Sequence, residues 1–316
     1  MKYLITLFFA LFVHLGTAQV IPSQPFFGLS NTQKAQILLP DIVSSIAWET
    51  NGNFSPDGKV FLYSTNFMWA GTTIIHMTLN DDSWSEPEIA SFSGEYADID
   101  PIFSPDGSRV YFTSRRPIDK NYPNKTDTNL WYVDVLEDGG FGEPKQVSLK
   151  INNDKKQAYN SVTREGTIYF HQRDSVSNDI YRAVWNSSEY EVERLDLSIN
   201  SSNSEADPYI SPNEDYLIFT SDRPGGYGDY DLYISFRVNG TWSQPINLGE
   251  DVNSIDKDFA PCMNSGILTF TSGRMIEPWN KDAKKDFKTL MSKFMSADNQ
   301  TDNIWYVHFD PEKYKK

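Results

Sequence analysis

Acidic residues recur along this chain at regular intervals, each just before a run of alternating apolar residues. A ring of such carboxylates could bind a divalent cation such as calcium, hold an amine or polarise the hydroxyl groups of a sugar. The alternative is structural, because the same side chains could cap neighbouring turns or pair with arginines of the chain. We predict binding by seven residues that align on the repeats and face the mouth of a central channel: Glu49, Asp98, Asp100, Gln157, Glu205, Asp207 and Asp258.

A second set of candidates follows a recurring Thr-Ser-x-Arg motif. The first repeat has Thr65 and Asn66 in its place, and the third has His171, Gln172 and Arg173. These departures reflect either a ligand site that breaks the symmetry of the repeats or drift at tolerant positions. The predicted binding residues of this set are Arg116, His171, Arg173, Arg223 and Arg274.

Glycoside hydrolysis is a chemistry that an acidic ring could support, since it needs two carboxylates about 5 to 9.5 Å apart. A polysaccharide lyase would need a base, and His171 is the best candidate because it ends a predicted strand, whereas His76 and His308 lie inside predicted strands. The sequence contains no Gly-x-Ser-x-Gly elbow of a serine hydrolase. No glycine-rich phosphate loop precedes a helix. We therefore predict no catalytic residue.

The elements that position these side chains are five tandem repeats. Each repeat contains a tight turn, typically Ser-Pro-Asp-Gly, followed by an alternating strand, as in residues 53–63, 102–112, 161–170, 209–219 and 262–270. The equivalent turn residues Gly58, Gly107, Gly166, Glu214 and Gly266 are 49, 59, 48 and 52 residues apart. Such spacings are typical of the blades of a β-propeller.

Every repeat continues with a loop, a further strand, a polar turn and a short outer segment, which makes four antiparallel strands per repeat. The sequence therefore predicts an all-β propeller of five blades, with six blades as the alternative. The fifth repeat ends at its third strand, residues 303–309, and lacks a fourth. Residues 35–40 resemble the outer segments elsewhere, so we predict that this N-terminal strand completes the fifth blade and closes the ring.

An insertion at about residues 275–300 interrupts the fifth repeat. Within it, residues 282–295 show a helical period, because Phe287, Leu290, Met291 and Phe294 recur at intervals of three and four. We predict a short helix there. The helix is either functional, as long loops in compact domains often are, or a decoration that packs its four apolar residues on the rim of the propeller.

The turn Phe-Ser-Pro-Asp-Gly, the motif Thr-Ser-x-Arg and the Asp-Ile/Leu-Tyr that follows together resemble the TolB-like propeller repeats of bacterial exported proteins. The closest stretch is residues 220–233, and the resemblance extends over about residues 36–309. It looks most like the single-domain type common in Bacteroidetes. The resemblance implies a periplasmic or secreted binding or scaffold module and brings no set of catalytic residues with it.

Composition and the first residues bound the location and the partners. Residues 1–18 read as a signal peptide cleaved near Ala18, which leaves a single domain over residues 19–316 with no transmembrane segment. Cys262 is the only cysteine, so neither an internal disulfide nor a multi-cysteine metal site can form. The chain has 43 acidic and 28 basic residues, and its net charge of −15 disfavours nucleic acid as a ligand.

These observations predict a non-catalytic, periplasmic or secreted propeller that engages a protein or a glycan through one face of the disc. No cofactor is predicted, although a divalent cation such as calcium could bind the acidic ring. The alternative is a glycan-active enzyme, a hydrolase or a lyase, that uses the carboxylates at the mouth of the channel. The sequence leaves the oligomeric state open.

Overall fold

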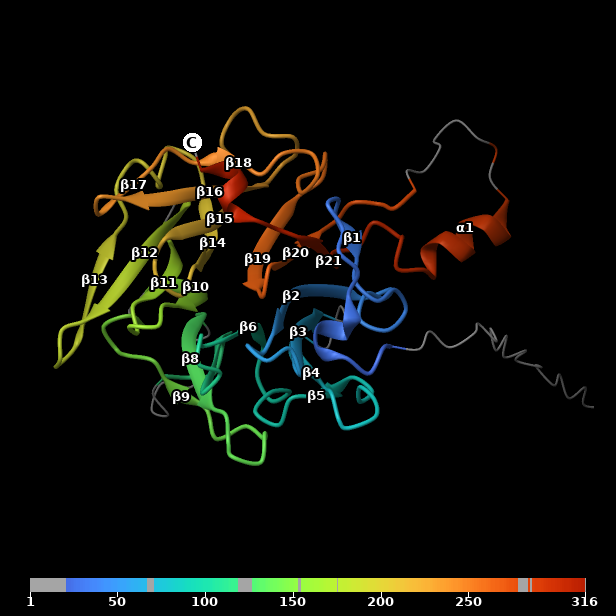
Figure 1. Ribbon diagram of the computed structural model, residues 1–316, viewed down its shortest axis with the longest axis horizontal. Helices are drawn as coiled ribbons and strands as arrows, with labels where there is room; N and C mark the ends of the chain where they lie inside the picture. The colour runs from blue at the N-terminus through green and yellow to red at the C-terminus, as the bar shows by residue number, and fades with distance from the viewer. Residues whose placement is uncertain are drawn as a thin grey trace, which may run out of the picture.

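Five antiparallel sheets arranged around a common axis make up the molecule (Figure 1). The computed structural model describes residues 21–66, 71–118, 127–152, 155–174, 176–277, 284 and 286–315. The predicted signal peptide, residues 1–18, lies outside the described residues. The all-β propeller of five blades that the repeats predict is confirmed, and the alternative of six blades is wrong.

The first three blades each contain four strands in sequence order from the axis outwards. Blade 1 consists of β2 (Trp48–Phe54), β3 (Val60–Asn66), β4 (Thr72–Thr78) and β5 (Glu88–Ile89). Blade 2 consists of β6 (Asp98–Phe103), β7 (Arg109–Ser114), β8 (Asn129–Asp134) and β9 (Lys145–Gln146). Blade 3 consists of β10 (Lys156–Val162), β11 (Ile168–Arg173), β12 (Asn178–Trp185) and β13 (Tyr190–Arg194).

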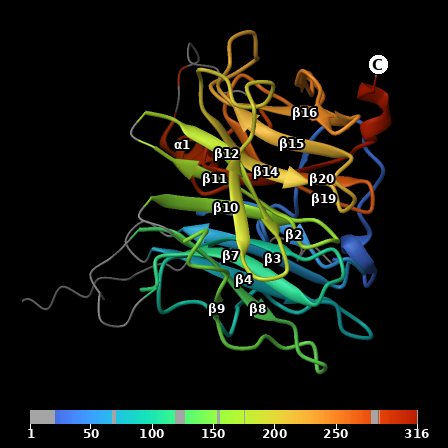
Figure 2. The ribbon, with the colours of Figure 1, turned by 90° about the vertical axis from the view of Figure 1, so that its left-hand side faces the viewer.

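Blade 4 carries one additional strand, and blade 5 combines both ends of the chain. Blade 4 consists of β14 (Glu205–Ile210), β15 (Tyr216–Ser221), β16 (Asp231–Val238), β17 (Thr241–Trp242) and β18 (Ile246–Asn247). Blade 5 consists of β19 (Asp258–Asn264), β20 (Ile267–Ser272), β21 (Asn303–His308) and β1 (Gln36–Ile37). Figure 2 shows the strands of neighbouring blades from the side.

The N-terminal strand closes the ring, as the sequence predicts. Strand β1 pairs antiparallel with β21, so that Gln36 lies opposite Tyr306 and Ile37 opposite Trp305. The next residue, Leu38, is fully buried, and its N–H donates a hydrogen bond to the carbonyl oxygen of Ile304 at 2.8 Å. The first and last strands that the structure describes therefore share one sheet, which closes the ring of blades.

In the repeated turns, a serine typically accepts a backbone hydrogen bond and a glycine adopts a positive φ. In blade 1 the Ser55 hydroxyl accepts a hydrogen bond from the Val60 N–H at 2.9 Å, which satisfies a donor within the turn. Gly58 adopts a φ of 70°, a conformation that costs glycine little. After each turn the second strand places an aromatic ring in the core, at Tyr63, Phe112, Phe170, Phe219 and Phe270.

Each inner strand bends at one residue with a positive φ. The pairing register shifts there in all five blades, as in a β-bulge. The residues concerned occupy equivalent positions: Asn51, Asp100, Tyr159, Asp207 and Ala260. A bulge changes the direction of the side chain that it carries. These five positions therefore form a second ring, each two residues after one of the predicted residues Glu49, Asp98, Gln157, Glu205 and Asp258.

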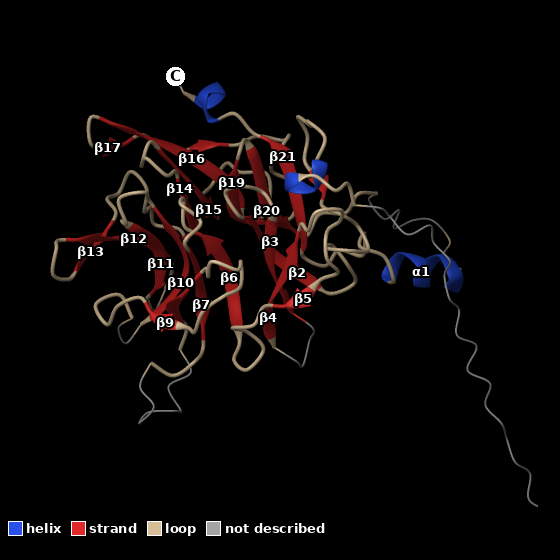
Figure 3. Ribbon diagram, turned by 60° about the horizontal axis from the view of Figure 1, so that its bottom comes forward, coloured by secondary structure: helices blue, strands red, loops and turns tan. Residues whose placement is uncertain are grey.

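Helical segments are few and peripheral (Figure 3). They are η1 (Pro25–Gly28), α1 (Phe287–Phe294) and η2 (Pro311–Tyr314). The helix predicted in the insertion is confirmed at α1, but its apolar side chains are exposed, so the alternative that they pack on the rim is wrong. No helix among the described residues has the length and apolar character needed to cross a membrane.

Candidate functional site

The predicted acidic residues separate into two rings, and the first lies at the start of the inner strands. All five of its members are buried, with at most 2% of their surface exposed. Each faces the end of the second strand in its own blade, for example Asp98 opposite Ser114 and Glu205 opposite Ser221. The ring consists of Glu49, Asp98, Gln157, Glu205 and Asp258.

In three blades the acid of this first ring pairs with the motif arginine. Arg116 lies 3.0 Å from Asp98 and Arg223 lies 3.0 Å from Glu205, while Arg274 pairs with Asp258 in the same way. The same guanidinium group donates to a backbone carbonyl of the preceding loop, as Arg223 does to Ile199 at 2.9 Å. The arginine therefore ties the loop to the inner strand and neutralises a buried charge.

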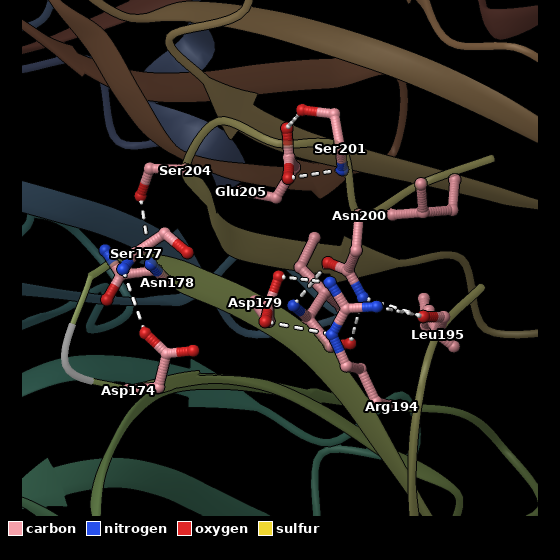
Figure 4. Close-up of polar contacts among 12 residues, drawn as sticks. Asp174, Ser177, Asn178, Asp179, Arg194, Leu195, Asn200, Ser201, Ser204 and Glu205 are labelled. Carbon is pink, nitrogen blue, oxygen red and sulfur yellow. Dashed lines mark hydrogen bonds and ion pairs between the residues drawn. The ribbon is translucent and has the colours of Figure 1, made fainter. Parts of the chain in front are cut away.

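Serine side chains complete the shell of these acids. Figure 4 shows Glu205 accepting hydrogen bonds from the Ser201 N–H at 2.8 Å and from the Ser201 hydroxyl at 2.7 Å. In blade 5, the Ser254 N–H and hydroxyl donate to Asp258 in the same arrangement. Burial raises the pKa of Asp258, and the positive charge of Arg274 and the hydrogen bonds oppose that rise. The oxygens of these acids are thus occupied by groups of the chain itself.

Blades 1 and 3 depart from this pattern in different ways. In blade 1, Glu49 accepts hydrogen bonds from the Ser45 N–H at 3.0 Å and the Ser45 hydroxyl at 2.6 Å, and no ion pair of the described residues includes it. Burial raises the pKa of Glu49. In blade 3, Gln157 replaces the acid and donates to Gln172 at 3.2 Å. The third blade therefore replaces an ion pair with two neutral amides.

The strand register corrects the placement of Arg173. Arg223 is the second residue after Ser221, which lies opposite Glu205. The second residue after Gln172, which lies opposite Gln157, is Asp174 rather than Arg173. Arg173 is exposed and does not occupy the position of the motif arginine. Alignment of the repeats by sequence misplaced Arg173, because the strand pairing, which the sequence does not show, fixes which residue lies opposite Gln157.

The second ring is formed by the five bulge residues, and a polar side chain of the preceding blade holds most of them. The N–H of Asp100 donates to the Ser64 hydroxyl at 3.0 Å, and that of Tyr159 to the Thr113 hydroxyl at 3.1 Å. The N–H of Asn51 donates likewise to Thr271 at 3.0 Å. These bonds join neighbouring blades around the axis. Sequence analysis missed Asn51 and Tyr159 because the bulge is not visible in the repeat pattern.

His171 takes the place of a threonine in this ring of bonds. Its Nδ1 atom accepts a hydrogen bond from the Asp207 N–H at 3.2 Å, so a neutral His171 carries its proton on Nε2. Burial, and to a smaller extent the nearby charge of Arg173, lower the pKa of His171 to about 4. The 3.4 Å approach of Nδ1 to the Asp207 carboxylate is therefore not an ion pair at neutral pH. A histidine with this pKa is a weak base.

Asp100 and Asp207 are the carboxylates of the second ring, and both are partly accessible. Burial raises the pKa of Asp100 to about 7, and the negative charge of Asp207 adds to the rise. Burial also raises the pKa of Asp207 to about 6, which hydrogen bonds from the Ala260 N–H and the Thr220 hydroxyl oppose. A carboxyl group with a pKa near neutral pH is partly protonated there, so it can donate as well as accept hydrogen bonds.

Tyr159 crosses the axis from blade 3 and contacts blade 5. Its hydroxyl donates to the carbonyl oxygen of Pro261 at 2.6 Å and lies 3.6 Å from the sulfur of Cys262. The side chain is almost completely buried. Burial raises the pKa of the Cys262 thiol to about 12, so this thiol is unreactive at neutral pH.

A small cavity of about 80 Å³ lies farther along the inner strands, and its wall includes Asn53, Ile102, Ser161, Tyr209, Met263 and Asn264. Since these residues follow the bulge in all five blades, the cavity lies toward the hairpin end of the channel, past Tyr159. Among the residues that the structure describes, no three His, Cys, Asp or Glu side chains are arranged to hold a metal ion. Calcium binding stays a prediction.

Comparison with known proteins gives the fold. No protein-family model matches the chain, and no curated protein matches it. The structure of a putative TolB from Agrobacterium tumefaciens matches with a TM-score of 0.50 at 17% identity, over 84% of this chain and 91% of that chain. The fold is that of a TolB-like β-propeller.

Two further solved structures that match this chain carry enzyme names. A glycoside hydrolase matches with a TM-score of 0.50 at 9% identity, over 88% of this chain and 92% of that chain. An α-L-arabinofuranosidase from Lactobacillus brevis matches with a TM-score of 0.49 at 10% identity, over 84% of this chain and 92% of that chain. At such identities a likeness shows the fold alone. Membership in the Bacteroidetes type stays a prediction.

Proposed function

We propose that this TolB-like propeller is an exported, non-catalytic binding module that holds a protein or a glycan against the mouth face. The mouth face is the end of the disc where the loops between second and third strands lie, apart from the insertion at residues 275–300 of blade 5, together with the loops that connect one blade to the next. Near its centre lie the partly accessible side chains of Asp100, Asp207 and His171, on the inner strands of blades 2 and 4 and the second strand of blade 3.

The observation that carries this proposal is the distribution of exposed apolar side chains. Loops of the mouth face expose such side chains around most of the ring: Ile46, Trp48, Tyr96, Leu149, Val176, Leu197, Tyr227 and Ile255. The hairpin turns of the opposite face expose fewer, among them Leu136 and Val238. Clustered apolar side chains on one face mark a site of interaction, and Trp and Tyr are the residues that most often anchor one.

The polar side chains near the centre of the mouth face supply polar recognition. Asp100 and Asp207 have raised pKa values, and His171 presents a neutral ring, so these groups can bind a hydroxyl or an amine of the partner. The acids of the first ring are buried and bind serines or arginines of the chain, whereas Asp100 and Asp207 are partly accessible, which favours the second ring as the place for a ligand. This division of roles favours binding over catalysis.

Two tryptophans of similar exposure allow a controlled test. Trp48 is 48% exposed on the mouth face, and Trp185 is 51% exposed at the hairpin end of blade 3. We expect the purified chain to bind a component of a glycan array, or a protein from the cell envelope of its source. Trp48→Ala combined with Tyr96→Ala should weaken that binding about tenfold or more.

Trp185→Ala is the control and should leave the affinity within about twofold, since it removes an equivalent aromatic side chain from the other end of the disc. Equal loss of binding in both variants would contradict the assignment to the mouth face. Because each tryptophan is about half exposed, thermal unfolding of both variants should resemble that of the parent protein.

Hydrolysis of a glycosidic bond is the second candidate, because Asp100 and Asp207 are both partly accessible and both have raised pKa values. An acid with a pKa near 7 suits proton donation to a leaving group. If the chain hydrolyses glycosidic bonds, the purified protein should release reducing sugar from a panel of polysaccharides, and Asp100→Asn and Asp207→Asn should each abolish the release. Binding to a polysaccharide without release of product would rule out hydrolysis of that substrate.

A further inference from the structure

The helix α1 presents its apolar face to solvent instead of to the propeller. Phe287, Leu290, Met291 and Phe294 follow one another at helical spacing and therefore lie on one side of the helix. Their exposed fractions are 77%, 47%, 37% and 63%, and no residue of α1 is buried. A surface helix of a soluble domain normally buries this face, so the helix is turned the opposite way.

Polar contacts on the other side of α1 hold it in this orientation. Lys293 pairs with Asp298 and donates a hydrogen bond to the carbonyl oxygen of Glu277 at 3.0 Å. Asp298 also accepts from the N–H groups of Ile276 and Glu277, at the base of the insertion. At the other end, Asp286 caps the helix through the Thr289 N–H at 2.9 Å. These bonds join α1 to the two ends of the insertion, and the apolar side chains of the helix remain exposed.

The charge of this segment is opposite to that of the whole molecule. Residues 281–293 contain five lysines and two aspartates, whereas the complete chain has a net charge of −15. Lys284 and Lys288 are exposed and lie on the helix or just before it. In Figures 1 and 3 the helix stands clear of the five sheets. The surface that covers α1 must therefore be apolar beneath and acidic at its boundary.

We propose that α1 is a peripheral membrane contact that inserts its apolar face into an anionic lipid surface. A helix with Phe and Leu on one face and lysines near its edge lies in the membrane interface, where the rings enter the acyl boundary and the ammonium groups reach lipid phosphates. A lipid surface meets both requirements of α1 without a preformed groove. The proposal does not depend on the partner of the mouth face.

Sedimentation with vesicles tests this proposal. The full purified chain is mixed with vesicles of phosphatidylglycerol and phosphatidylcholine, or of phosphatidylcholine alone, at low and high salt. We expect binding to the anionic vesicles that falls as salt rises, because exposed charges are screened. Phe287→Asp with Phe294→Asp should lower the bound fraction about tenfold or more. Lys284→Gln with Lys288→Gln should remove the preference for phosphatidylglycerol.

A matched control changes exposed apolar residues elsewhere. Leu136→Asp with Val238→Asp alters side chains that are 46% and 52% exposed on the opposite face of the disc, outside the mouth face, and it should leave vesicle binding unchanged. Absence of binding to vesicles at every phosphatidylglycerol content would overturn the proposal. So would a dimer, seen by light scattering, that the Phe287 and Phe294 substitutions dissociate, because the apolar face would then belong to a second copy. Failure of either kind leaves the proposed function of the mouth face untouched.

Discussion

At the scale of single residues, two positions along the same strand decide whether an acid is structural or available. Asp98 begins its inner strand, is buried and pairs with Arg116, whereas Asp100 lies at the bulge and faces the axis. The same offset separates Glu205 from Asp207. An alternating strand would place both members of each pair on one face, but the positive φ of the second residue turns it away.

Asp100→Asn should change how stability depends on pH. The pKa of Asp100 rises from 3.8 when unfolded to about 7 when folded, so the folded state binds more protons between these values. Its contribution to stability therefore falls as pH rises from about 4 to about 7 and is constant above. Relative to the parent, the variant should gain on the order of 2 kcal/mol across this range in urea unfolding.

The companion variant Asp207→Asn should behave in the same way over a narrower range, because its folded pKa is about 6. A difference between variant and parent that stays constant from pH 4.5 to pH 8 would show that neither carboxylate is displaced from its ordinary pKa.

Substitution can distinguish a motif arginine, Arg223, from Arg173, which does not occupy the motif position. Arg223→Ala should lower the free energy of unfolding by about 3 kcal/mol, because it leaves the carboxylate of Glu205 buried without a counter-ion. Arg173→Ala should change it by less than about 0.5 kcal/mol, since Arg173 is exposed. Chemical denaturation of both variants measures the difference. Equal changes in the free energy of unfolding would show that Arg173 has the same structural role as the motif arginines.

At the scale of elements, buried asparagines decide how the strands of a blade are held. Asn200 accepts from the Ile180 N–H at 2.7 Å and donates to the Ile180 carbonyl at 2.9 Å, so it fastens β12 to the loop that follows blade 3. Asn152 and Asn253 hold β8 and β16 in the same way. Asn160, in β10, is also buried, but its amide has no hydrogen-bond partner among the described residues.

These two kinds of asparagine should respond oppositely to the same substitution. Asn160→Val should raise the free energy of unfolding by about 1 kcal/mol, because it removes a buried polar group that lacks partners and adds a good strand former. Asn200→Val should lower it by about 2 kcal/mol, because the N–H and carbonyl of Ile180 lose their partner. Thermal unfolding measures both. A loss of stability in Asn160→Val would show that its amide is satisfied.

At the scale of the whole molecule, stability depends on a contact between the two ends of the chain. Strand β1 supplies the outer strand of blade 5, and Leu38 beside it is fully buried. Phe27 of η1 adds to this junction, with its ring 4.2 Å from that of Trp84 in blade 1. The ring is therefore closed by a short segment that is far in sequence from the rest of its blade.

Leu38→Ala should lower the free energy of unfolding by about 3 kcal/mol, since it creates a cavity beside the sheet in which β1 pairs with β21. Leu149→Ala removes a leucine that is 71% exposed and should have an effect below about 0.5 kcal/mol. Calorimetry of the two variants tests the role of closure. If Leu38→Ala unfolds like the parent, the N-terminal segment does not stabilise the closed ring.

The sequence alone determined the architecture, because a propeller repeats one local pattern. The turn glycines, the alternating strands and the missing fourth strand of the last repeat are all local features, so blade number and closure by residues 35–40 could be counted from them. The helix at α1 was predictable for the same reason, since the period of its apolar residues is local.

Tertiary structure decided which of the predicted residues are free for a ligand. The partner of Asp98 or Glu205 depends on the pairing register, and the bond from Asp207 to His171 crosses between blades, so neither follows from one repeat. The exposure of the apolar face of α1 depends on the ion pair between Lys293 and Asp298, which forms only in the folded insertion. Burial, register and contacts between blades are properties of the assembled ring, and a periodic sequence cannot specify them one repeat at a time.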